Sequence, residues 1–280
     1  MKSVVITGVS SGIGLDVTRE LIEHDFHVFG SVRKIKDAEK LSKIFGDKFK
    51  PLIFDVCEKT AIASAAISIK EQLGNNLLTG LINNAGIAVA GPLMHLPHGE
   101  LQKQFDVNVQ GVMNVTREFL PLLGAGKKSD QQPGRIINIS SVSGSISYPF
   151  IGPYAASKHA LESLSESLRR ELMLYGIDVI LIAPGTTDSM MWAKAKDTPE
   201  YKDTDYRDIL SRLRDGILGS QRSDALPVEK VSRLIRRALT ASKPKTRYVI
   251  LKHKLMGWYL PRSLPARWLD KMIAHRLGMD

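Results

Sequence analysis

The alternation of short apolar segments with amphipathic ones constrains this chain more than any other feature. Apolar runs that end in glycine or polar residues indicate strands: SVVITG (3–8), FHVFGSV (26–32), KPLIFDV (50–56), LLTGLINNAG (77–86), RIINISS (135–141), IDVILIAPG (177–185) and TRYVIL (246–251). Segments with helical spacing separate them, at 14–24, 36–45, 59–73, 100–123, 154–176 and 228–239. Repeated β-α units of this kind predict an α/β fold, in which helices cover both faces of a parallel sheet.

The same pattern predicts how the chain is divided. Neither a linker nor an internal repeat interrupts residues 1–251, so we expect a single domain there. Within it, residues 186–226 are irregular and rich in Met, Asp and Lys, and we expect them to form a lid or insertion over the substrate. Residues 252–280 follow as a basic, amphipathic C-terminal extension, with two short helices broken at Pro261 and Pro265.

The net charge of +10 is concentrated at one end of the chain. Residues 229–280 carry 13 Lys/Arg and 3 Asp/Glu, so the first 228 residues are electroneutral. A neutral body argues against nucleic acid as a partner. Basic residues beside Trp and Leu in the extension suit a membrane surface. The alternative for the extension is a cover packed on the substrate cleft or on a partner subunit.

The chain is predicted to be cytoplasmic, and membrane association through the extension remains an alternative. It enters a strand at MKSVVITG, without the basic leader and apolar core of a signal peptide. Its longest uncharged runs, 72–94 and 136–157, are rich in Asn, Ser, Gly and Pro and are poor bilayer spans. Cys57 is the only cysteine, which excludes an internal disulfide and fits a reducing compartment.

Three glycines lie between the first strand and the first helix. The loop TGVSSGIG contains Gly8, Gly12 and Gly14. Glycines let backbone approach a diphosphate, and a helix N-terminus offers free N–H groups and a positive dipole end. The spacing differs from the common G-x-G-x-x-G, and a structural tight turn is the alternative. The preceding strand and the following helix favour a dinucleotide site.

Residues after the next strands favour NADP(H) over NAD(H). The second strand ends near Ser31, which Arg33 and Lys34 follow, and an acidic residue that would bind both ribose hydroxyls is missing. A cation there favours a 2′-phosphate, and solvated loop charges are the alternative reading. Asp55 could hold the adenine amino group or cap the following helix. NNAG (83–86) places small polar residues at the sheet edge where ligands bind.

Tyr154 and Lys158 are one helical turn apart in GPYAASKHALESL (152–164). A nearby ammonium stabilises phenolate and lowers the tyrosine pKa from its usual value near 10, so the tyrosine can exchange a proton with an alcohol or carbonyl oxygen. Ser141 closes the fifth strand at the same edge and can hydrogen-bond that oxygen. The neighbouring hydroxyls are less favoured alternatives: Ser140, Ser143 and Ser145.

Asn108, in FDVNVQG, is a polar residue within an apolar helical pattern. We expect it to bind a water that links Lys158 to solvent. The alternative is a residue that kinks the helix and is satisfied by its own backbone.

Together these motifs resemble the short-chain dehydrogenase/reductase family over roughly residues 1–250. TGVSSGIG, NNAG, FDVNVQG, the spacing of Ser141, Tyr154 and Lys158, and the Pro-Gly at 184–185 carry the resemblance. It implies a Rossmann fold, a doubly wound sheet of seven parallel strands in the order 3-2-1-4-5-6-7. Within the family, FGSVRK, NNAGIAVAGPL and the C-terminal extension look most like hydroxysteroid and retinol dehydrogenases and similar carbonyl reductases.

The resemblance also implies roles for individual residues. Tyr154 is then the general acid/base, Lys158 lowers its pKa and binds the nicotinamide ribose, Ser141 orients substrate, and Asn108 belongs to the proton relay. Ser189 stands where the family often has Thr, with Thr186 and Thr187 nearer to Gly185. The implied cofactor contacts are Gly8, Ser10, Ser11, Gly12, Ile13, Gly14, Ser31, Arg33, Asp55, Val56, Asn83, Ala85, Gly86, Tyr154, Lys158, Pro184, Gly185, Thr187 and Ser189. The family's long helices imply a homodimer.

The predicted substrate is a lipophilic ketone or secondary alcohol, such as a steroid, a retinoid or an acyl chain. Met and Trp suit an adaptable apolar pocket, so we expect Met190, Met191 and Trp192 to bind substrate with Ser141 and Tyr148. The chain is therefore predicted to be an NADP(H)-dependent oxidoreductase without a metal. The alternative is a non-catalytic NADP-binding regulator or membrane-surface protein, which would not need Ser141, Tyr154 and Lys158 together.

Overall fold

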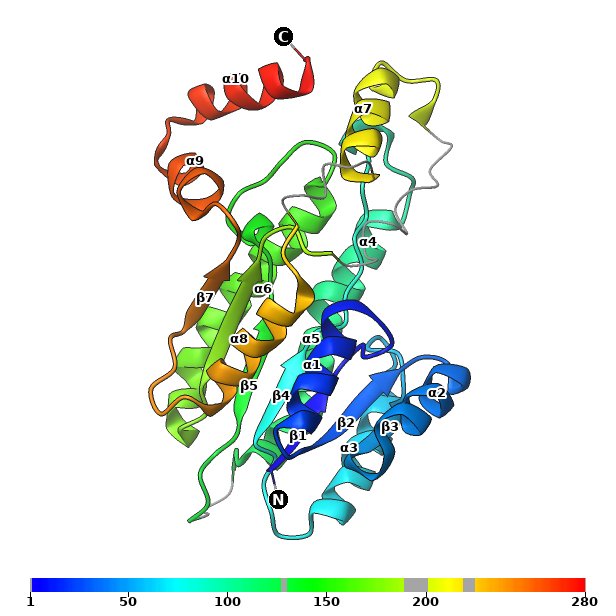
Figure 1. Cartoon of the computed structure of the whole chain (residues 1–280), viewed down its shortest axis with the longest axis vertical. Helices are drawn as coiled ribbons and strands as arrows, with labels where there is room; N and C mark the ends of the chain where they lie inside the picture. Colours follow the sequence, from blue (N-terminus) through cyan, green and yellow to red (C-terminus); the bar gives the residue numbers. More distant parts are fainter. Residues whose placement is uncertain (1, 127–129, 189–200, 219–224, 280) are drawn as a thin grey trace.

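The computed structural model of the chain has a seven-stranded parallel sheet at its centre (Figure 1). It describes residues 2–126, 130–188, 201–218 and 225–279, and only the backbone of 213–218. The strands are β1 (Lys2–Ile6), β2 (Phe26–Val32), β3 (Phe49–Ile53), β4 (Gly80–Asn83), β5 (Arg135–Ile139), β6 (Val179–Pro184) and β7 (Arg247–Ile250). Their order is β3-β2-β1-β4-β5-β6-β7, and every pair is parallel, which confirms the predicted topology.

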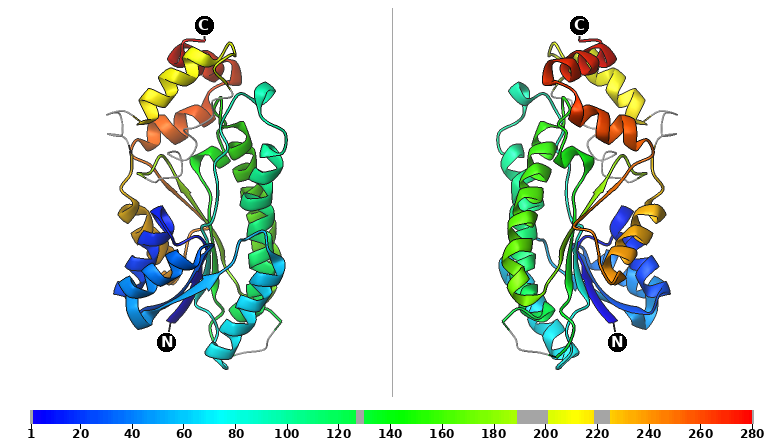
Figure 2. Two further views of the ribbon diagram at one scale, coloured as in Figure 1. Left: turned by 90° about the vertical axis from the view of Figure 1, so that its right-hand side faces the viewer. Right: turned by 90° about the vertical axis from the view of Figure 1, so that its left-hand side faces the viewer.

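Helices cover both faces of this sheet (Figure 2). On one face lie α1 (Gly12–Glu23), α2 (Ile35–Phe45) and α8 (Val228–Thr240), and on the other lie α3 (Lys59–Leu73), α4 (Glu100–Phe105), α5 (Gly111–Phe119) and α6 (Gly152–Glu171). Successive residues of β1 alternate between the two layers, because strand side chains point to opposite faces. Val4 and Ile6 enter one core and Val5 the other. Burial on both faces explains why the strands are apolar throughout.

The helix predicted over 100–123 is continuous but irregular. A π-helical turn at Asp106–Gln110 joins α4 to α5, and a 3-10 turn at Leu120–Leu123 follows. Single π-helical turns inside α-helices often occur at functional sites. Asn108 lies within this turn and is buried.

A cap lies beyond the carboxyl ends of the strands, at the top of Figures 1 and 2. We use "the cap" for α7 (Arg207–Leu218), the π-helical turn Leu255–Tyr259, α9 (Leu260–Ser263) and α10 (Ala266–Leu277). The cap contains two departures from the sequence prediction. A regular helix, α7, lies in the segment predicted to be irregular, because apolar residues recur there at helical spacing amid many charges. Pro261 sits in the first turn of α9, which needs no N–H donor, so the chain breaks before α10 at Pro265 alone.

Two contacts join parts of the cap to one another. Trp258 is buried, and the Arg262 guanidinium lies 4.5 Å from the centre of its ring. Gly278, just beyond α10, approaches the guanidinium of Arg212 on α7. Each helix in the described part of the chain is too short or too polar to cross a bilayer.

Candidate active site

A cavity of about 510 Å³ opens at the carboxyl ends of the strands, beneath the cap. Its wall brings together most of the residues singled out from the sequence: Gly8, Ser10, Ser11, Gly12, Ile13, Ser31, Arg33, Asp55, Val56, Ala85, Gly86, Ser141, Tyr148, Tyr154, Lys158, Pro184, Gly185 and Thr187. Gly14, Asn83 and Asn108 lie behind this wall. Four further residues fall outside the described part of the chain: Ser189, Met190, Met191 and Trp192.

The glycine loop forms one end of the cavity. Gly8 and Gly12 have φ angles of 72° and 58°, a region that side chains other than glycine rarely adopt. At Gly14 a Cβ atom would lie 2.3 Å from the Gly8 carbonyl oxygen, so this glycine lets α1 pack closely behind the loop. The N-terminus of α1, at Gly12, therefore meets the cavity with bare backbone. This cradle fits the diphosphate of a dinucleotide.

The two asparagines of NNAG have different positions. Asn83 is the last residue of β4, and its buried amide donates to Asn138 Oδ1 at 2.8 Å and to Thr116 Oγ1 at 3.1 Å. Asn84 lies in the cavity wall, where its amide donates to the Thr7 and Gly8 carbonyls at 2.9 and 3.0 Å. Strand alternation turns one residue inward and the next toward the cavity.

One end of the cavity contains Ser31, Arg33 and Asp55. These residues lie at the ends of β2 and β3, on the opposite side of β1 from β5 in the strand order. The Ser31 hydroxyl accepts a 3.1 Å hydrogen bond from the Gly8 N–H, so it also supports the glycine loop. Arg33 Nη1 lies 3.6 Å from Asp55 Oδ2, and 69% of the Arg33 side chain is exposed. An exposed guanidinium at the end of β2 can reach a ribose 2′-phosphate.

Helix α6 supplies Tyr154 and Lys158 from its first two turns. Tyr154 is buried and forms a hydrogen bond with the Ser141 side chain. Lys158 Nζ donates to the Ile139 carbonyl at 2.7 Å and lies 5.7 Å from the centre of the Tyr154 ring. The end of β5 and the start of α6 therefore place the three predicted catalytic residues on one side of the cavity.

Burial decides the pKa values of both titratable groups. It lowers the pKa of Lys158 from 10.5 to about 8, and the charge of Glu162 acts in the opposite direction. It raises the pKa of Tyr154, and the hydrogen bond from Ser141 offsets part of this rise. Desolvation therefore sets the direction in which the tyrosine pKa moves. At neutral pH Tyr154 keeps its proton, which is the form that can donate one.

Asn108 ties the wall of the cavity to α6. Its amide donates to the Ile87 carbonyl at 3.0 Å and to Ser157 Oγ at 3.1 Å, and its Oδ1 accepts from the Ile87 N–H at 2.9 Å. Ser157 in turn donates to the Tyr154 carbonyl at 2.8 Å. Asn108 is thus bonded to the backbone of another segment and to a side chain of a neighbouring helix. The alternative drawn from the sequence expected its partner to be the backbone of its own helix.

The cavity wall also contains apolar residues that sequence reasoning did not single out. They are Ile87, Ala88, Val142 and Ile151 beside the half-buried Tyr148. Their location after β4 and β5 is the signal that could have identified them, because residues following parallel strands gather at the ligand-binding edge.

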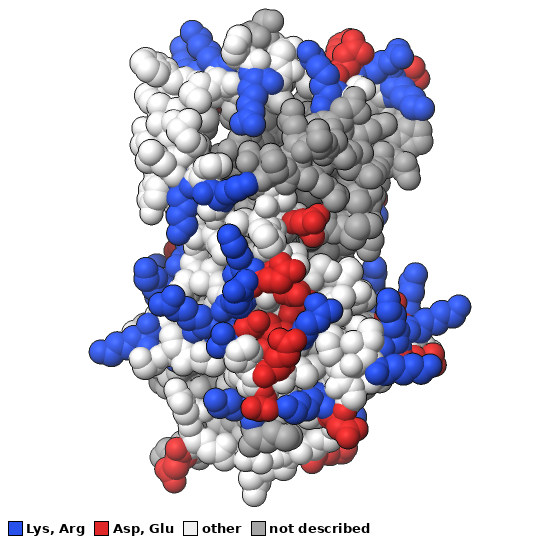
Figure 3. All heavy atoms as spheres, in the orientation of Figure 1, with Lys and Arg blue, Asp and Glu red and all other residues white. Residues whose placement is uncertain are grey.

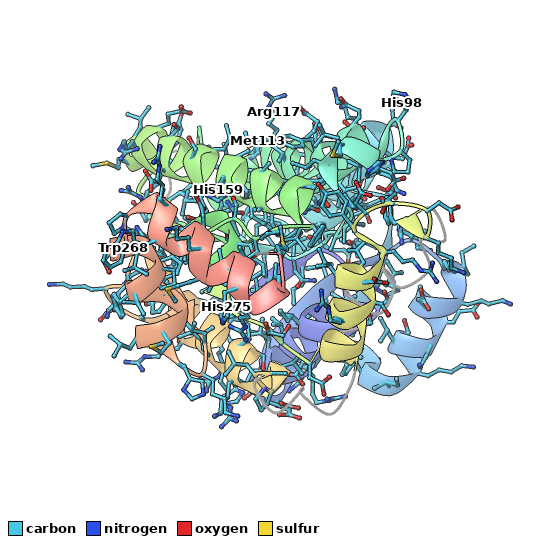
Figure 4. All side chains as sticks on the ribbon, turned by 90° about the horizontal axis from the view of Figure 1, so that it is seen from above. His98, Met113, Arg117, His159, Trp268 and His275 are labelled. Atoms are coloured by element: carbon cyan, nitrogen blue, oxygen red, sulfur yellow. The ribbon has the colours of Figure 1, made fainter. Side chains whose placement is uncertain are left out.

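The cap reaches the mouth of the cavity. Figure 4 looks down on it and shows α10 running above the sheet edge, with Trp268 toward the outside and His275 toward the middle. Arg276 of α10 lies near enough to Tyr148 for its charge to lower the phenol pKa, although burial raises that pKa more strongly. The cavity is therefore lined by the glycine loop, the residues after the strands and the start of α6, and Arg276 brings the C-terminal extension close to Tyr148 in its wall.

Comparison with known proteins agrees with this geometry. A protein-family model described as short chain dehydrogenase matches residues 2–200. The chain is similar to the NADPH-dependent 3-dehydrocapnine reductase of Ornithobacterium rhinotracheale, with 42% identity over 97% of this chain and 96% of that protein. It is similar to retinol dehydrogenase 16 of Mus musculus, with 32% identity over 97% and 87%. The crystal structure of a short-chain dehydrogenase from Streptomyces avermitilis superposes with a TM-score of 0.79, at 25% identity over 100% of this chain and 98% of that one.

Proposed function

Because the chain belongs to the short-chain dehydrogenase/reductase family, we propose that it reduces a lipophilic ketone with NADPH, using Tyr154 as the proton donor. The oxidoreductase class and the preference for NADP(H) follow from the family and from the NADPH-dependent relative. The nature of the ketone and the role of Tyr154 are our proposal. The observation that carries it is the buried Tyr154 beside Ser141 and Lys158, in the same cavity as the glycine loop.

The residues of the cavity divide the chemistry between them. NADPH supplies the hydride when bound. Ser141 holds the carbonyl oxygen next to the Tyr154 hydroxyl, which donates the proton that completes the alcohol. The Lys158 ammonium stabilises the phenolate that remains, and it can also hold a ribose hydroxyl. Asn108 keeps Ile87 and α6 at a fixed separation through its three hydrogen bonds, so the reacting groups are preorganised.

Two features support a lipophilic substrate. The cavity wall includes the apolar side chains of Ile87, Val142 and Ile151 and the ring of Tyr148. Apart from Arg33 and Asp55 at the ends of β2 and β3, Lys158 is the charged residue among the described lining residues. Retinol dehydrogenase 16, a relative over nearly the whole chain, acts on a lipophilic alcohol by its name. An apolar pocket with few polar groups binds apolar molecules and fixes their orientation through those groups.

The direct test measures NADPH consumption against a panel of carbonyl compounds, from small diketones to steroids, retinal and long-chain ketones. We expect turnover with the lipophilic members and a loss of at least about 100-fold in Tyr154→Phe, since general acid catalysis contributes about 10²–10⁴-fold. Fluorescence titration should show that the variant still binds NADPH. Turnover of small polar carbonyls alone would contradict the lipophilic pocket, and NADPH binding without any turnover would favour the regulator alternative.

We also propose a homodimer. Helices α4 and α5 lie beside α6 on one outer face (Figure 2), and this face exposes Leu101 and Leu164. Met113 and Arg117 lie along the same outer face in Figure 4. Exposed apolar side chains on adjacent helices suit pairing with a second copy. Sedimentation velocity should give a dimer for the wild type and a monomer for Leu164→Glu; a monomeric wild type would refute the proposal.

The cap supplies the proposed contact with the cytoplasmic face of a membrane. Leu255, Tyr259 and Trp268 are exposed, at 71%, 60% and 68%. Lys and Arg side chains stand around these helices at the top of Figure 3. Apolar and basic side chains on one surface favour anionic lipid. In flotation with anionic vesicles, Trp268→Ser should reduce recovery, whereas Ile35→Ser, a change at a similarly exposed residue on α2, should not. Equal recovery of both variants would contradict membrane contact.

A further inference from the structure

Helix α6 continues its functional face one turn beyond Lys158. Tyr154, Lys158 and Glu162 follow at intervals of four residues, so all three side chains point to the same side of the helix. Glu162 is buried, with 6% of its side chain exposed. A buried carboxylate is costly unless it has partners, so its contacts indicate what it is for.

The partners of Glu162 come from the segment that carries Ser141. Ser140 Oγ donates to Glu162 Oε1 at 2.8 Å, and Ser145 Oγ lies 3.4 Å from Oε2. Between them the chain packs tightly, since a Cβ atom on Gly144 would lie 2.8 Å from Oε1. Ser141 is adjacent to Ser140, and its own Oγ accepts from the Ser143 N–H at 3.1 Å. The carboxylate thus holds both ends of the short loop that positions Ser141.

The charge of Glu162 is balanced from the far edge of the sheet. Arg247, the first residue of β7, forms an ion pair with Oε2 and lies 3.6 Å from Glu166, one turn further along α6. Burial raises the pKa of Glu162, whereas Ser140, Arg247, Ser145 and His159 on α6 act in the opposite direction. On the cavity side the charged neighbour is Lys158, whose ammonium is favoured by the carboxylate.

We propose that Glu162 is a positioning residue for the reduction: it fixes the Ser140–Ser145 loop against α6 so that Ser141 faces Tyr154, and its charge keeps Lys158 cationic in a buried site. The inference rests on the proposed function, and Glu162 is not among the site residues predicted from the sequence. It acts through its neighbours, because its carboxylate lies behind the cavity wall.

The experiment compares Glu162→Gln with Glu166→Gln in the full-length protein. Glu162 and Glu166 lie on the same helix, and each carboxylate is paired with Arg247, so both changes remove a partner of this arginine. Glu166 differs in that it is 46% exposed and lies away from the loop. For Glu162→Gln we expect a fall of at least about tenfold in kcat, because misplaced reacting groups are costly. We also expect the alkaline limb of the kcat profile to move to lower pH, since Lys158 loses its proton more readily without the nearby negative charge. Glu166→Gln should match the wild type in both respects.

Ser140→Ala provides the second variant if Glu162→Gln fails to fold. It removes the closest hydrogen bond to the loop and keeps the carboxylate, so kcat should fall while the alkaline limb stays in place. Folding is checked by thermal melting and by NADPH titration. A folded Glu162→Gln with wild-type kcat, or with an unmoved pH profile, would overturn the inference. Loss of the proposed function itself has a separate signature: the wild type would turn over no ketone, or Tyr154→Phe would remain active.

Discussion

At the scale of single residues, the proposed chemistry depends on Lys158, whose charged form is destabilised by burial. Lys158 is buried, and its pKa falls to about 8 as a result. Ketone reduction needs the ammonium, so we expect kcat to decline as the pH rises through about 8. Tyr154 does not produce this limb, because its pKa is raised above the usual 10. A pH profile of kcat with saturating NADPH measures the limb, and a flat profile up to pH 10 would contradict the assignment.

The same lysine should lower stability at neutral pH. Its folded-state pKa lies below the unfolded value of 10.5, so the penalty is fully present below pH 8 and disappears as the pH rises from about 8 to 10.5. The difference corresponds to about 3 kcal/mol. Lys158→Met should therefore stabilise the protein by about 2 kcal/mol, after about 1 kcal/mol for the lost hydrogen bond to Ile139.

Urea unfolding at pH 7 measures this gain, and the variant should be inactive. Lys43→Met, a change at an exposed position of α2, serves as the control and should leave stability within about 0.5 kcal/mol of the wild type. A destabilised Lys158→Met would show that the hydrogen bond and packing of Lys158 outweigh its desolvation.

At the scale of elements, Arg135 joins three parts of the fold. It begins β5, and its buried guanidinium donates to the Ala238 and Leu239 carbonyls, at 3.1 and 2.8 Å, near the end of α8. Its Nε lies 3.3 Å from Asp178 before β6. A cation at the C-terminus of a helix also interacts favourably with the helix dipole.

Arg135→Met should destabilise the protein by about 2–4 kcal/mol, because two buried carbonyls lose their donor. Denaturant unfolding measures the effect, and Arg170→Met is the matched control. Arg170 is 62% exposed, and its pair with Glu166 at 3.6 Å should contribute about 0–1 kcal/mol. Equal losses in the two variants would contradict the role assigned to Arg135.

The sequence predicted the elements better than it predicted their ends. The parallel sheet followed from the β-α alternation and the strand order from the family resemblance, and both are confirmed. Hydrophobic periodicity cannot show a π-helical turn, because one extra residue leaves both flanking helices amphipathic; Asp106–Gln110 was therefore missed. The sequence could not show which of Asn83 and Asn84 has its side chain in the cavity wall. The last residue of a strand is uncertain by one position from sequence, and a shift of one position turns a side chain to the opposite face of the sheet.

At the scale of the whole molecule, the described side chains of the cap are mostly exposed or half-buried. Trp258 is the buried exception among them, and the described residues of α10 are all at least partly exposed. Trp258→Ala should loosen the cap and raise KM for long lipophilic ketones about tenfold, while a small carbonyl that stays near Tyr154 should keep its kcat/KM. Trp268→Ala, at an exposed position of α10, is the control for kinetics in the absence of lipid. A uniform loss for all substrates would show that Trp258 supports the body of the enzyme instead.

The position of the cap also has a consequence for how this enzyme can change. The residues proposed to handle hydride and proton come from the strand ends and α6, whereas α9 and α10 follow β7, outside the strands of the sheet. A segment outside the strands can be exchanged without re-threading the sheet or shifting its register. Selection can therefore alter the cap while the proposed catalytic residues stay fixed, and the cap is the natural place to graft a new substrate specificity.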